Sequence, residues 1–178
     1  MNYNLTLLLL FVLSNTAFIL GQSNSLSSNL TLTNEAEPGQ KIVILGRIVD
    51  KKNNEKLSNV VIEVHQTDIT GNYSAGGKNE KSPRLNGELI SDKNGEFVIN
   101  SIKPNSYPGT TFPKHIHFTI RKEGYQTKFT EMLFEDDKNL KSQDFRRDKK
   151  RGDFNLIRKI DKVENGIEYY SLFVGLEK

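Results

Sequence analysis

The sequence predicts an all-β fold, an antiparallel β-sandwich built from short strands. Five segments combine β-branched residues with partial alternation of apolar and polar side chains, and each ends at glycine, asparagine, aspartate or proline. These segments are residues 41–50, 57–68, 95–102, 115–124 and 128–136. No stretch between them has the periodicity of a helix. Short strands that follow one another in this way are typical of a sandwich.

The first residues have the composition of an export signal. Residues 5–13 read LTLLLLFVL and are followed at once by polar residues, so the apolar run is too short to span a bilayer. We therefore predict a signal peptide over residues 1–21, with cleavage near Gly21. The mature chain is then expected in the periplasm or outside the cell, with no stable insertion in the membrane.

The next segment, residues 22–40, is rich in Ser, Asn and Thr and has no periodic apolar face. Such a composition indicates a linker or an N-terminal arm laid over the domain. One β-sandwich domain is predicted over residues 41–178, a length that fits a single core. Because the chain has no cysteine, this domain must be stabilised by core packing or by a bound metal rather than by disulfides.

Turn residues separate the predicted strands. Asp50–Lys56 and Asp92–Gly95 supply Asn, Asp and Gly, which tolerate a positive φ. A glycine-rich segment, residues 68–88, reads as one long loop, and loops of that length in compact domains are usually functional or disordered. Residues 135–153 form a charged excursion without a helical pattern. Two further strands are predicted to close the chain, over residues 154–160 and 167–177.

The charge balance does not favour nucleic acid as a partner. The formal net charge is +3, and basic residues are interleaved with acidic ones along the chain. A mixed, solvated surface follows from this pattern. The strands are compatible with an oligomer but do not specify one.

Two of the three histidines form the run His115-Ile116-His117 in a segment that reads as a strand. Residues i and i+2 of a strand face the same side, so both imidazoles can reach one metal ion while Ile116 points into the opposite layer. The spacing is that of metal ligands, although surface or packed histidines produce the same pattern. The surrounding residues must decide between these alternatives.

Two tyrosines accompany the histidine pair. Tyr107 lies eight residues before His115, and Tyr73 follows a glycine at the start of the glycine-rich segment. Phenolate oxygens are hard anionic donors that favour Fe(III) over Fe(II), and imidazoles complete a mixed nitrogen and oxygen site.

With these residues in place, the sequence resembles the intradiol ring-cleavage dioxygenases, the catechol and protocatechuate enzymes. The resemblance covers roughly residues 41–136, with the motifs in the same order as in the family. The combination of motifs is more specific than any one of them. The motifs are Gly46–Asp50, Val60–Asp68, Gly71–Tyr73, Ser91–Phe97, Ile102–Pro108, Pro113–Phe118 and Thr130–Phe134. The fold that it implies is a sandwich with a prealbumin-like, or transthyretin-like, frame.

The resemblance implies a mononuclear, non-haem Fe(III) site. Its four protein ligands would be Tyr73, Tyr107, His115 and His117, with Tyr107 and His117 axial and a water or hydroxide at the fifth position. The implied substrates are a small aromatic diol and O2, and the implied product is a cis,cis-muconate-type diacid. Tyr107 would also act in catalysis by taking up a proton of the diol. The protein would supply Lewis-acid activation and orientation.

Several positions depart from the family pattern. An arginine usually stands three residues before the first histidine, and here that residue is Phe112. The glutamine of the family's T-Q-M-Y-F strand is Glu131, and the tryptophan of W-Q-A is His65, although Gln66 is kept. Phe112, Glu131 and Gln66 are therefore the candidate substrate-binding residues. A carboxylate at position 131 would disfavour an acidic catechol such as protocatechuate.

Three consequences of these departures stay open at this point. Lys114 or Arg84 is an alternative source of the missing positive charge. His65 is expected to be a loop or packing residue rather than a fifth ligand. Glu131 is either a solvated strand residue or a partner of a metal ligand.

A second function is compatible with part of the sequence. The segments around Gly46–Asp50, Asp92–Phe97 and Ile102–Tyr107 also resemble transthyretin-like and carboxypeptidase-regulatory-like sandwiches, which are binding modules without enzyme activity. Those modules give no reason for the His-Ile-His run. Tyrosinate-to-Fe(III) colour tests the metal site, and turnover of a panel of catechols by iron-loaded protein separates the enzyme from the silent module.

Overall fold

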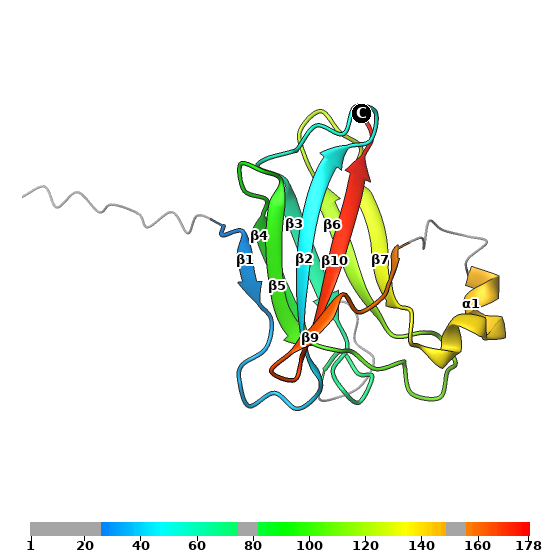
Figure 1. Ribbon diagram of the computed structural model, residues 1–178. Helices are drawn as coiled ribbons and strands as arrows, with labels where there is room; N and C mark the ends of the chain where they lie inside the picture. Colours follow the sequence, from blue (N-terminus) through cyan, green and yellow to red (C-terminus); the bar gives the residue numbers. More distant parts are fainter. Residues whose placement is uncertain (1–25, 75–81, 149–155) are drawn as a thin grey trace, which may run out of the picture.

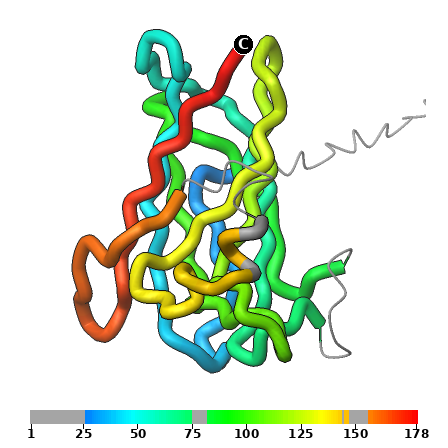
Figure 2. The backbone as a smooth tube through the Cα atoms, turned by 90° about the vertical axis from the view of Figure 1, so that its right-hand side faces the viewer, coloured from blue at the N-terminus to red at the C-terminus, as the bar shows by residue number. Residues whose placement is uncertain are grey.

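In the computed structural model, two β-sheets pack face to face around one apolar core (Figures 1 and 2). The structure describes residues 26–74, 82–148 and 156–178. The predicted β-sandwich is confirmed. The predicted signal peptide, residues 1–21, lies outside the described residues. Within the described ranges, neither helical segment is long and apolar enough to cross a bilayer.

The first sheet has the strand order β1-β5-β2-β10-β9. Its strands are β1 (Asn29–Thr31), β2 (Lys41–Asp50), β5 (Glu96–Ile102), β9 (Lys162–Glu164) and β10 (Ile167–Leu176). Alternate residues of β2 and β10 point into the core, among them Ile42, Ile44 and Leu172, which are at most 1% exposed. This alternation is the period of a strand with one buried face.

The second sheet has the order β4-β3-β6-β7-β8 and carries the candidate site. Its strands are β3 (Val61–Gln66), β4 (Leu85–Ile90), β6 (His115–Arg121), β7 (Lys128–Phe134) and β8 (Leu156–Arg158). Along β6, Ile116, Phe118 and Ile120 face the core and are at most 2% exposed. Their neighbours in sequence therefore face outward.

The strand pairing is mixed rather than purely antiparallel. Three pairs run parallel in the described part of the chain: β1 with β5, β2 with β10, and β7 with β8. Turn residues predict hairpins between neighbouring segments, and they contain no information about pairs that are distant in sequence. The parallel pairs therefore depend on tertiary packing.

Two segments differ from the sequence-based expectation. The end of the predicted glycine-rich loop, residues 85–88, belongs instead to strand β4, which pairs with β3 in antiparallel register. The charged segment after β7 contains a short 3-10 helix, Lys138–Lys141, and a single α-helix, α1 (Gln143–Asp148). Asp137 caps the 3-10 helix because its side chain accepts a hydrogen bond from the Asn139 N–H at 2.8 Å.

The N-terminal arm joins the two sheets at one edge. The carbonyl of Ser27 accepts a hydrogen bond from Ile90 on β4, and the carbonyl of Ser28 accepts one from Val98 on β5. Leu30 packs against the core and covers Gly87, where a Cβ atom would lie 2.9 Å from the leucine side chain. The arm therefore adds strand β1 to one sheet and closes the sandwich against the other.

Candidate metal centre

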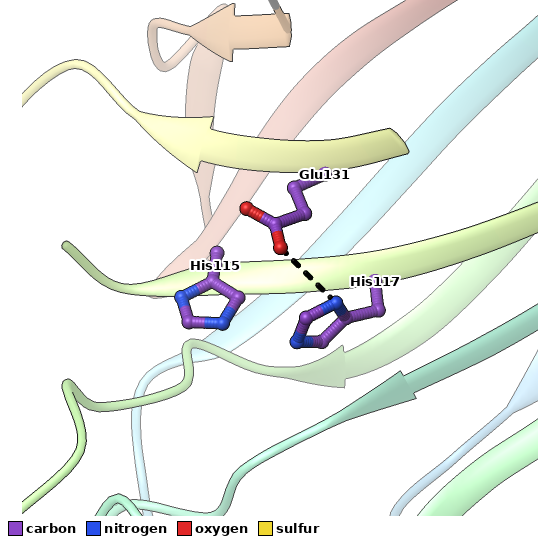
Figure 3. Close-up of side chains that lie close together, drawn as sticks. All are labelled: His115, His117 and Glu131. Atoms are coloured by element: carbon purple, nitrogen blue, oxygen red, sulfur yellow. Dashed lines mark ion pairs between the residues drawn. The ribbon is translucent and has the colours of Figure 1, made fainter. Parts of the chain in front are cut away.

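Strand β6 positions the two histidines on one face. His115 and His117 point away from the core, whereas Ile116 between them is 0% exposed. Figure 3 shows both imidazoles on the same side of the strand. The alternation of the strand alone therefore produces the predicted pair.

Tyr73 comes from the turn that follows β3. The side-chain oxygen Oδ1 of Asp68 accepts hydrogen bonds from the backbone N–H groups of Thr70 at 2.8 Å and Asn72 at 3.2 Å, which folds the chain back. Gly71 has a φ of +79°, a conformation that glycine adopts without strain. The turn places the Tyr73 side chain inside the protein, where it is 2% exposed.

Tyr107 comes from the segment between β5 and β6, which packs directly on the Tyr73 turn. The N–H of Asn105 donates to the Asp68 carbonyl at 3.1 Å, and the Asn105 side-chain amide donates to the Ile69 carbonyl at 3.1 Å. A Cβ atom at Gly71 would lie 2.0 Å from the Ser106 carbonyl oxygen. The two tyrosine-bearing segments therefore touch backbone to backbone at Gly71.

The polar ends of all four predicted ligands converge. The hydroxyl oxygens of Tyr73 and Tyr107 lie 2.6 Å apart. The Tyr73 oxygen lies 2.8 Å from His117 Nε2, and the Tyr107 oxygen lies 2.8 Å from His115 Nε2 and 3.3 Å from His117 Nε2. The sequence therefore identified four residues that the fold brings together.

In each imidazole, Nδ1 makes a contact outside the cluster of tyrosine oxygens, so Nε2 is the atom that can bind a metal. His115 Nδ1 lies 2.7 Å from the buried Pro113 carbonyl oxygen, an acceptor that requires the proton on Nδ1. His117 Nδ1 lies 3.2 Å from Glu131 Oε1. Figure 3 marks this contact with a dashed line. With Nδ1 protonated, the Nε2 lone pair of each ring points to the tyrosine oxygens, which is the tautomer a metal ligand needs.

Burial keeps both imidazoles neutral. It lowers the pKa of His115 to about 4, and the neighbouring His65 contributes to the shift. It lowers the pKa of His117 to about 2, with further contributions from His115 and His65. Neither ring needs to lose a proton at neutral pH before it can bind a metal.

The spacing of the donor atoms fits a single metal ion. Donors that bind one ion at about 2.1 Å lie about 3 Å apart when their bonds meet at right angles. The hydroxyl and Nε2 contacts cluster around that value. A carboxylate, Glu131, also lies within 4.8 Å of both histidines. Its contact is with His117 Nδ1, on the side away from the tyrosines, so it is a partner of a ligand rather than a fifth donor.

His65 and Glu131 flank His117 in the sheet. Strand register places His65 opposite His117 on one side and Glu131 opposite His117 on the other. The rings of His65 and His117 stack with centroids 4.5 Å apart and planes 10° apart. His65 is therefore a packing residue, as expected, although it lies on β3 rather than in a loop. Glu131 orients His117 through the Nδ1 contact.

Phe112 packs an aromatic ring where the family has an arginine. Its ring is 5.0 Å from His115 and 6.2 Å from Tyr107, centroid to centroid, and it meets Phe145 of α1 edge to face at 6.3 Å. Phe145 is 2% exposed. The aromatic group therefore covers one side of the Tyr107 and His115 rings and adds no charge.

Arg84 and Lys114, the two alternative sources of the missing positive charge, have different roles. Arg84 donates two hydrogen bonds to the Glu37 carboxylate, at 2.8 Å and 2.7 Å, so its charge is used at the N-terminal arm. The backbone N–H of Lys114 donates to Asp137 Oδ2 at 2.6 Å. This bond fixes the start of β6 and does not use the Lys114 side chain.

Gln66 faces the opposite side of the sheet from the two imidazoles. It is 0% exposed and pairs in register with Ile116, so its side chain points into the core. Its amide donates to the Ile102 carbonyl at 2.8 Å, and its side-chain oxygen accepts a hydrogen bond from Ser101 at 2.8 Å. The structure thus places Gln66 between the sheets and not at the ligand cluster.

Sequence reasoning missed three contributors to the site. The Pro113 carbonyl has no sequence signature, since every residue has one. Phe145 lies in a segment whose charge pattern hides it, and its aromatic ring is the one signal there that could have indicated burial. The Glu37 to Arg84 pair joins residues far apart in the sequence, which no local pattern reveals.

Comparisons with known proteins show which family this sequence is similar to. The sequence model of the family described as Dioxygenase matches residues 15–173. Catechol 1,2-dioxygenase 2 of Acinetobacter lwoffii is 26% identical over 125 residues, which cover 61% of this chain and 45% of that protein. The protocatechuate 3,4-dioxygenase beta chain of Burkholderia cepacia is 27% identical over 110 residues, which cover 56% of this chain and 46% of that protein.

Solved structures share the fold. A 3-chlorocatechol 1,2-dioxygenase from Rhodococcus opacus 1CP superposes with a TM-score of 0.72 at 24% identity, over 86% of this chain and 66% of that one. The dioxygenase domain of a carbohydrate-binding fusion from Streptomyces sp. SirexAA-E gives 0.61 at 20% identity, over 82% and 86%. The chain spans about half the length of the curated relatives it matches. The family model covers most of the sequence, and the chain belongs to the intradiol ring-cleavage dioxygenase family.

Proposed function

We propose that this protein is a non-haem Fe(III) dioxygenase that cleaves a catechol-type aromatic diol between its two hydroxylated carbons. The observation that carries the proposal is the convergence of Tyr73, Tyr107, His115 and His117 through two phenol oxygens and two Nε2 atoms. Two hard phenolate donors favour ferric iron over zinc or Fe(II). Bound Fe(III) would supply Lewis-acid activation of the diol.

The diol and O2 supply all the atoms and electrons that the reaction needs. The bond between the hydroxylated carbons breaks, and both atoms of O2 enter the cis,cis-muconate-type diacid. No external electron donor is required, which fits a small domain without a nucleotide-binding motif.

Tyr107 is the residue that we expect to take up a proton of the diol. Its ring is half-buried, whereas Tyr73 is 2% exposed and enclosed by the turn that carries it. The more exposed of the two tyrosines is the one that we expect an incoming substrate to reach. Phe112 covers one face of the Tyr107 ring and limits the access of water from that side. His117 is held by Glu131, so the site keeps its geometry while Tyr107 changes its contacts.

The substrate we propose is a catechol without a carboxylate. Glu131 lies beside the cluster with a side chain 14% exposed, and Phe112 offers an apolar surface in place of the usual arginine. A groove of about 590 Å³ on the same face of the sheet is lined by Glu63, His65 and Glu88 among others. Glu63 and Glu88 are paired with Arg121, at 2.7 Å and 3.4 Å, so the carboxylate that disfavours an acidic ring substituent is Glu131. Catechol, 4-methylcatechol and hydroxyquinol fit this charge pattern.

Colour and oxygen uptake test the proposal. Iron-loaded protein should be red-brown, because tyrosinate-to-Fe(III) charge transfer absorbs broadly in the visible. It should consume O2 with catechol, with loss of the catechol ultraviolet band. A preparation that stays colourless after reconstitution with ferric iron refutes the metal site.

A Tyr107→Phe variant tests the role of the accessible phenol. Removing one of two phenolates should shift the visible band and slow turnover by at least about tenfold. An unchanged spectrum in this variant contradicts the assignment of Tyr107 as a ligand.

The substitution of Phe112 for arginine favours a second candidate, a module of the same fold that binds metal without turnover. Iron-loaded, coloured protein that consumes no O2 with any of the three diols would support this alternative. We also propose that the protein acts after export, given the signal-like first 21 residues. N-terminal sequencing of the secreted or periplasmic protein tests that step.

A further inference from the structure

The turn that carries Tyr73 is hydrogen-bonded to Arg84, which lies near the end of the glycine-rich segment. The backbone N–H of Arg84, directly before β4, donates to the Tyr73 carbonyl at 2.6 Å. The Arg84 guanidinium lies 3.5 Å from Asp68 Oδ2, while Asp68 Oδ1 folds the turn by accepting N–H groups of Thr70 and Asn72. Arg84 therefore contacts both ends of the turn, Asp68 and Tyr73.

Arg84 is in turn held by the N-terminal arm. Its guanidinium donates two parallel hydrogen bonds to the Glu37 carboxylate, at 2.8 Å and 2.7 Å. A bidentate pair of this kind fixes the orientation of the guanidinium as well as its position. The Glu37 side chain is only 9% exposed, and that of Arg84 is 43% exposed. The pair is thus sheltered at the carboxylate end.

Glu37 is itself fixed in place. Lys41 at the start of β2 donates from Nζ to the carbonyls of Glu37 at 2.9 Å and of Asn34 at 3.2 Å. These bonds close the arm into a compact loop before the first long strand. The hydrogen bond from Arg84 lowers the pKa of Glu37, so its carboxylate is charged at neutral pH. The arm therefore presents a fixed negative charge to the Tyr73 turn.

We propose that Glu37 and Arg84 are positioning residues for the metal centre, through which the N-terminal arm holds Tyr73 in place. The path runs from the Glu37 carboxylate to the Arg84 guanidinium, and from Arg84 to Asp68 and the Tyr73 carbonyl. The inference rests on the proposed role of Tyr73 as a ligand. It adds that residues outside the ligand cluster, in a segment that composition marks as a linker, set the strength of metal retention.

A positioning role and a merely stabilising role give different results. An ion pair whose guanidinium is 43% exposed contributes little to the free energy of unfolding, so loss of this pair should change the melting temperature only slightly. A positioning role predicts instead a local effect, confined to the Tyr73 turn and to the metal. Amide exchange at Arg84 measures the effect on the Tyr73 turn directly, because the Arg84 N–H donates a hydrogen bond to the Tyr73 carbonyl.

The test compares Glu37→Gln in the full chain with Glu96→Gln as a matched control. Glu96 pairs with Arg47 on the other sheet, with side chains 44% and 39% exposed, far from the Tyr73 turn in the topology. In metal-free Glu37→Gln, we expect the Arg84 amide to exchange about tenfold faster with solvent. In iron-loaded Glu37→Gln, we expect about fivefold faster loss of iron to a chelator, with a shifted visible band. Glu96→Gln should match the wild type in all three measurements.

Arg84→Gln should show at least the Glu37→Gln effect, because it also removes the contact with Asp68, and the double variant should be no worse than Arg84→Gln alone. Wild-type rates of Arg84 exchange and of iron release in Glu37→Gln overturn the proposal, as do equal changes in Glu96→Gln. The exchange measurement uses metal-free protein, so it decides the positioning role independently of iron. A wild-type protein that takes up no iron refutes the proposed function, and the exchange data then still decide whether the arm fixes the turn.

Discussion

The two halves of the candidate metal centre are built by different means. His115 and His117 come from one regular strand, and the period of that strand places both imidazoles on one face. Tyr73 and Tyr107 come from two irregular segments that are held by specific contacts at Gly71, Asn105 and Asp68. The histidine half is therefore protected by the hydrogen bonds of a whole sheet, whereas the tyrosine half depends on a few individual groups.

This difference has consequences for how each half fails. A change in the strands must remove a ligand, or the side chain that orients it, to matter, because sheet register keeps the backbone in place. A change in the loops can displace a ligand without touching it. The predictions below separate these two cases, starting from the largest effect.

Removal of a ligand from the strand should abolish the site without unfolding the sheet. Loss of a residue that only orients a ligand lowers metal affinity by up to ~100-fold. His117→Ala removes a ligand itself and is expected to lower iron affinity by more than that. Titration with ferric iron followed by metal analysis measures this loss. The far-ultraviolet circular dichroism spectrum should stay that of a β-sandwich. Stoichiometric iron in His117→Ala would show that the histidine half is dispensable.

A methyl group at Gly71 should break the tyrosine half from outside the ligand set. In Gly71→Ala, the positive φ of +79° and the Cβ contact with the Ser106 carbonyl together should cost about 3 kcal/mol of unfolding free energy. Iron binding should fall as well, because the two tyrosine segments are pushed apart. Thermal unfolding and iron content measure the two effects.

Gly124→Ala is the matched control for Gly71→Ala. Gly124 has a similar φ of +78°, and nothing lies within 4 Å of a Cβ atom placed there. Its substitution should therefore show only the strain of the backbone, about 1 kcal/mol, with normal iron content. Equal effects at the two glycines would mean that the contact between the tyrosine segments is unimportant.

Acid should destabilise the metal-free protein through the histidine half. The pKa of His115 is about 4 in the folded state against 6.5 as its ordinary value, so the unfolded state binds more protons between these limits. The stabilising effect of the neutral ring is complete above pH 6.5 and is lost as the pH falls towards 4. At pH 5 the loss from His115 is about 2 kcal/mol.

The contribution of His115 is isolated by difference. Urea unfolding of the wild type and of His115→Gln between pH 7.5 and pH 5 cancels the protonation of carboxylates common to both proteins. Protonation of His115 destabilises only the wild type. The unfolding free energy of the wild type should therefore decrease relative to that of His115→Gln as the pH falls. Parallel curves for the two proteins would contradict the assignment of a buried, neutral His115.

The smallest effect is expected at the partner of a ligand. Glu131→Ala removes the acceptor for His117 Nδ1–H and should lower iron affinity about tenfold. Glu131→Gln keeps an acceptor oxygen and should recover most of that loss if orientation, rather than charge, is the role of Glu131. Competition with a chelator measures both variants. Equal losses in the two variants would assign the effect to charge instead.

Much of the site was readable from the sequence because its signals are local or ordered along the chain. The His-Ile-His run predicts a same-face pair from strand geometry alone. Tyr73 and Tyr107 were identified by the order of motifs around them, and the fold brings them to the histidines as expected. The β-sandwich follows from alternating segments separated by turn residues, and all seven predicted strands appear within or close to their expected ranges.

Other features were decided only by tertiary structure. The pairing of the last long strand with β2, the closure of the sandwich by the arm and the Glu37 to Arg84 pair all join residues distant in the sequence. The orientation of His117 by Glu131 depends on register between neighbouring strands, which composition does not determine. Local patterns fix which side chains share a face, because the backbone period is local. Which faces and loops meet is fixed by packing, because that free energy is gained only when the whole core is assembled.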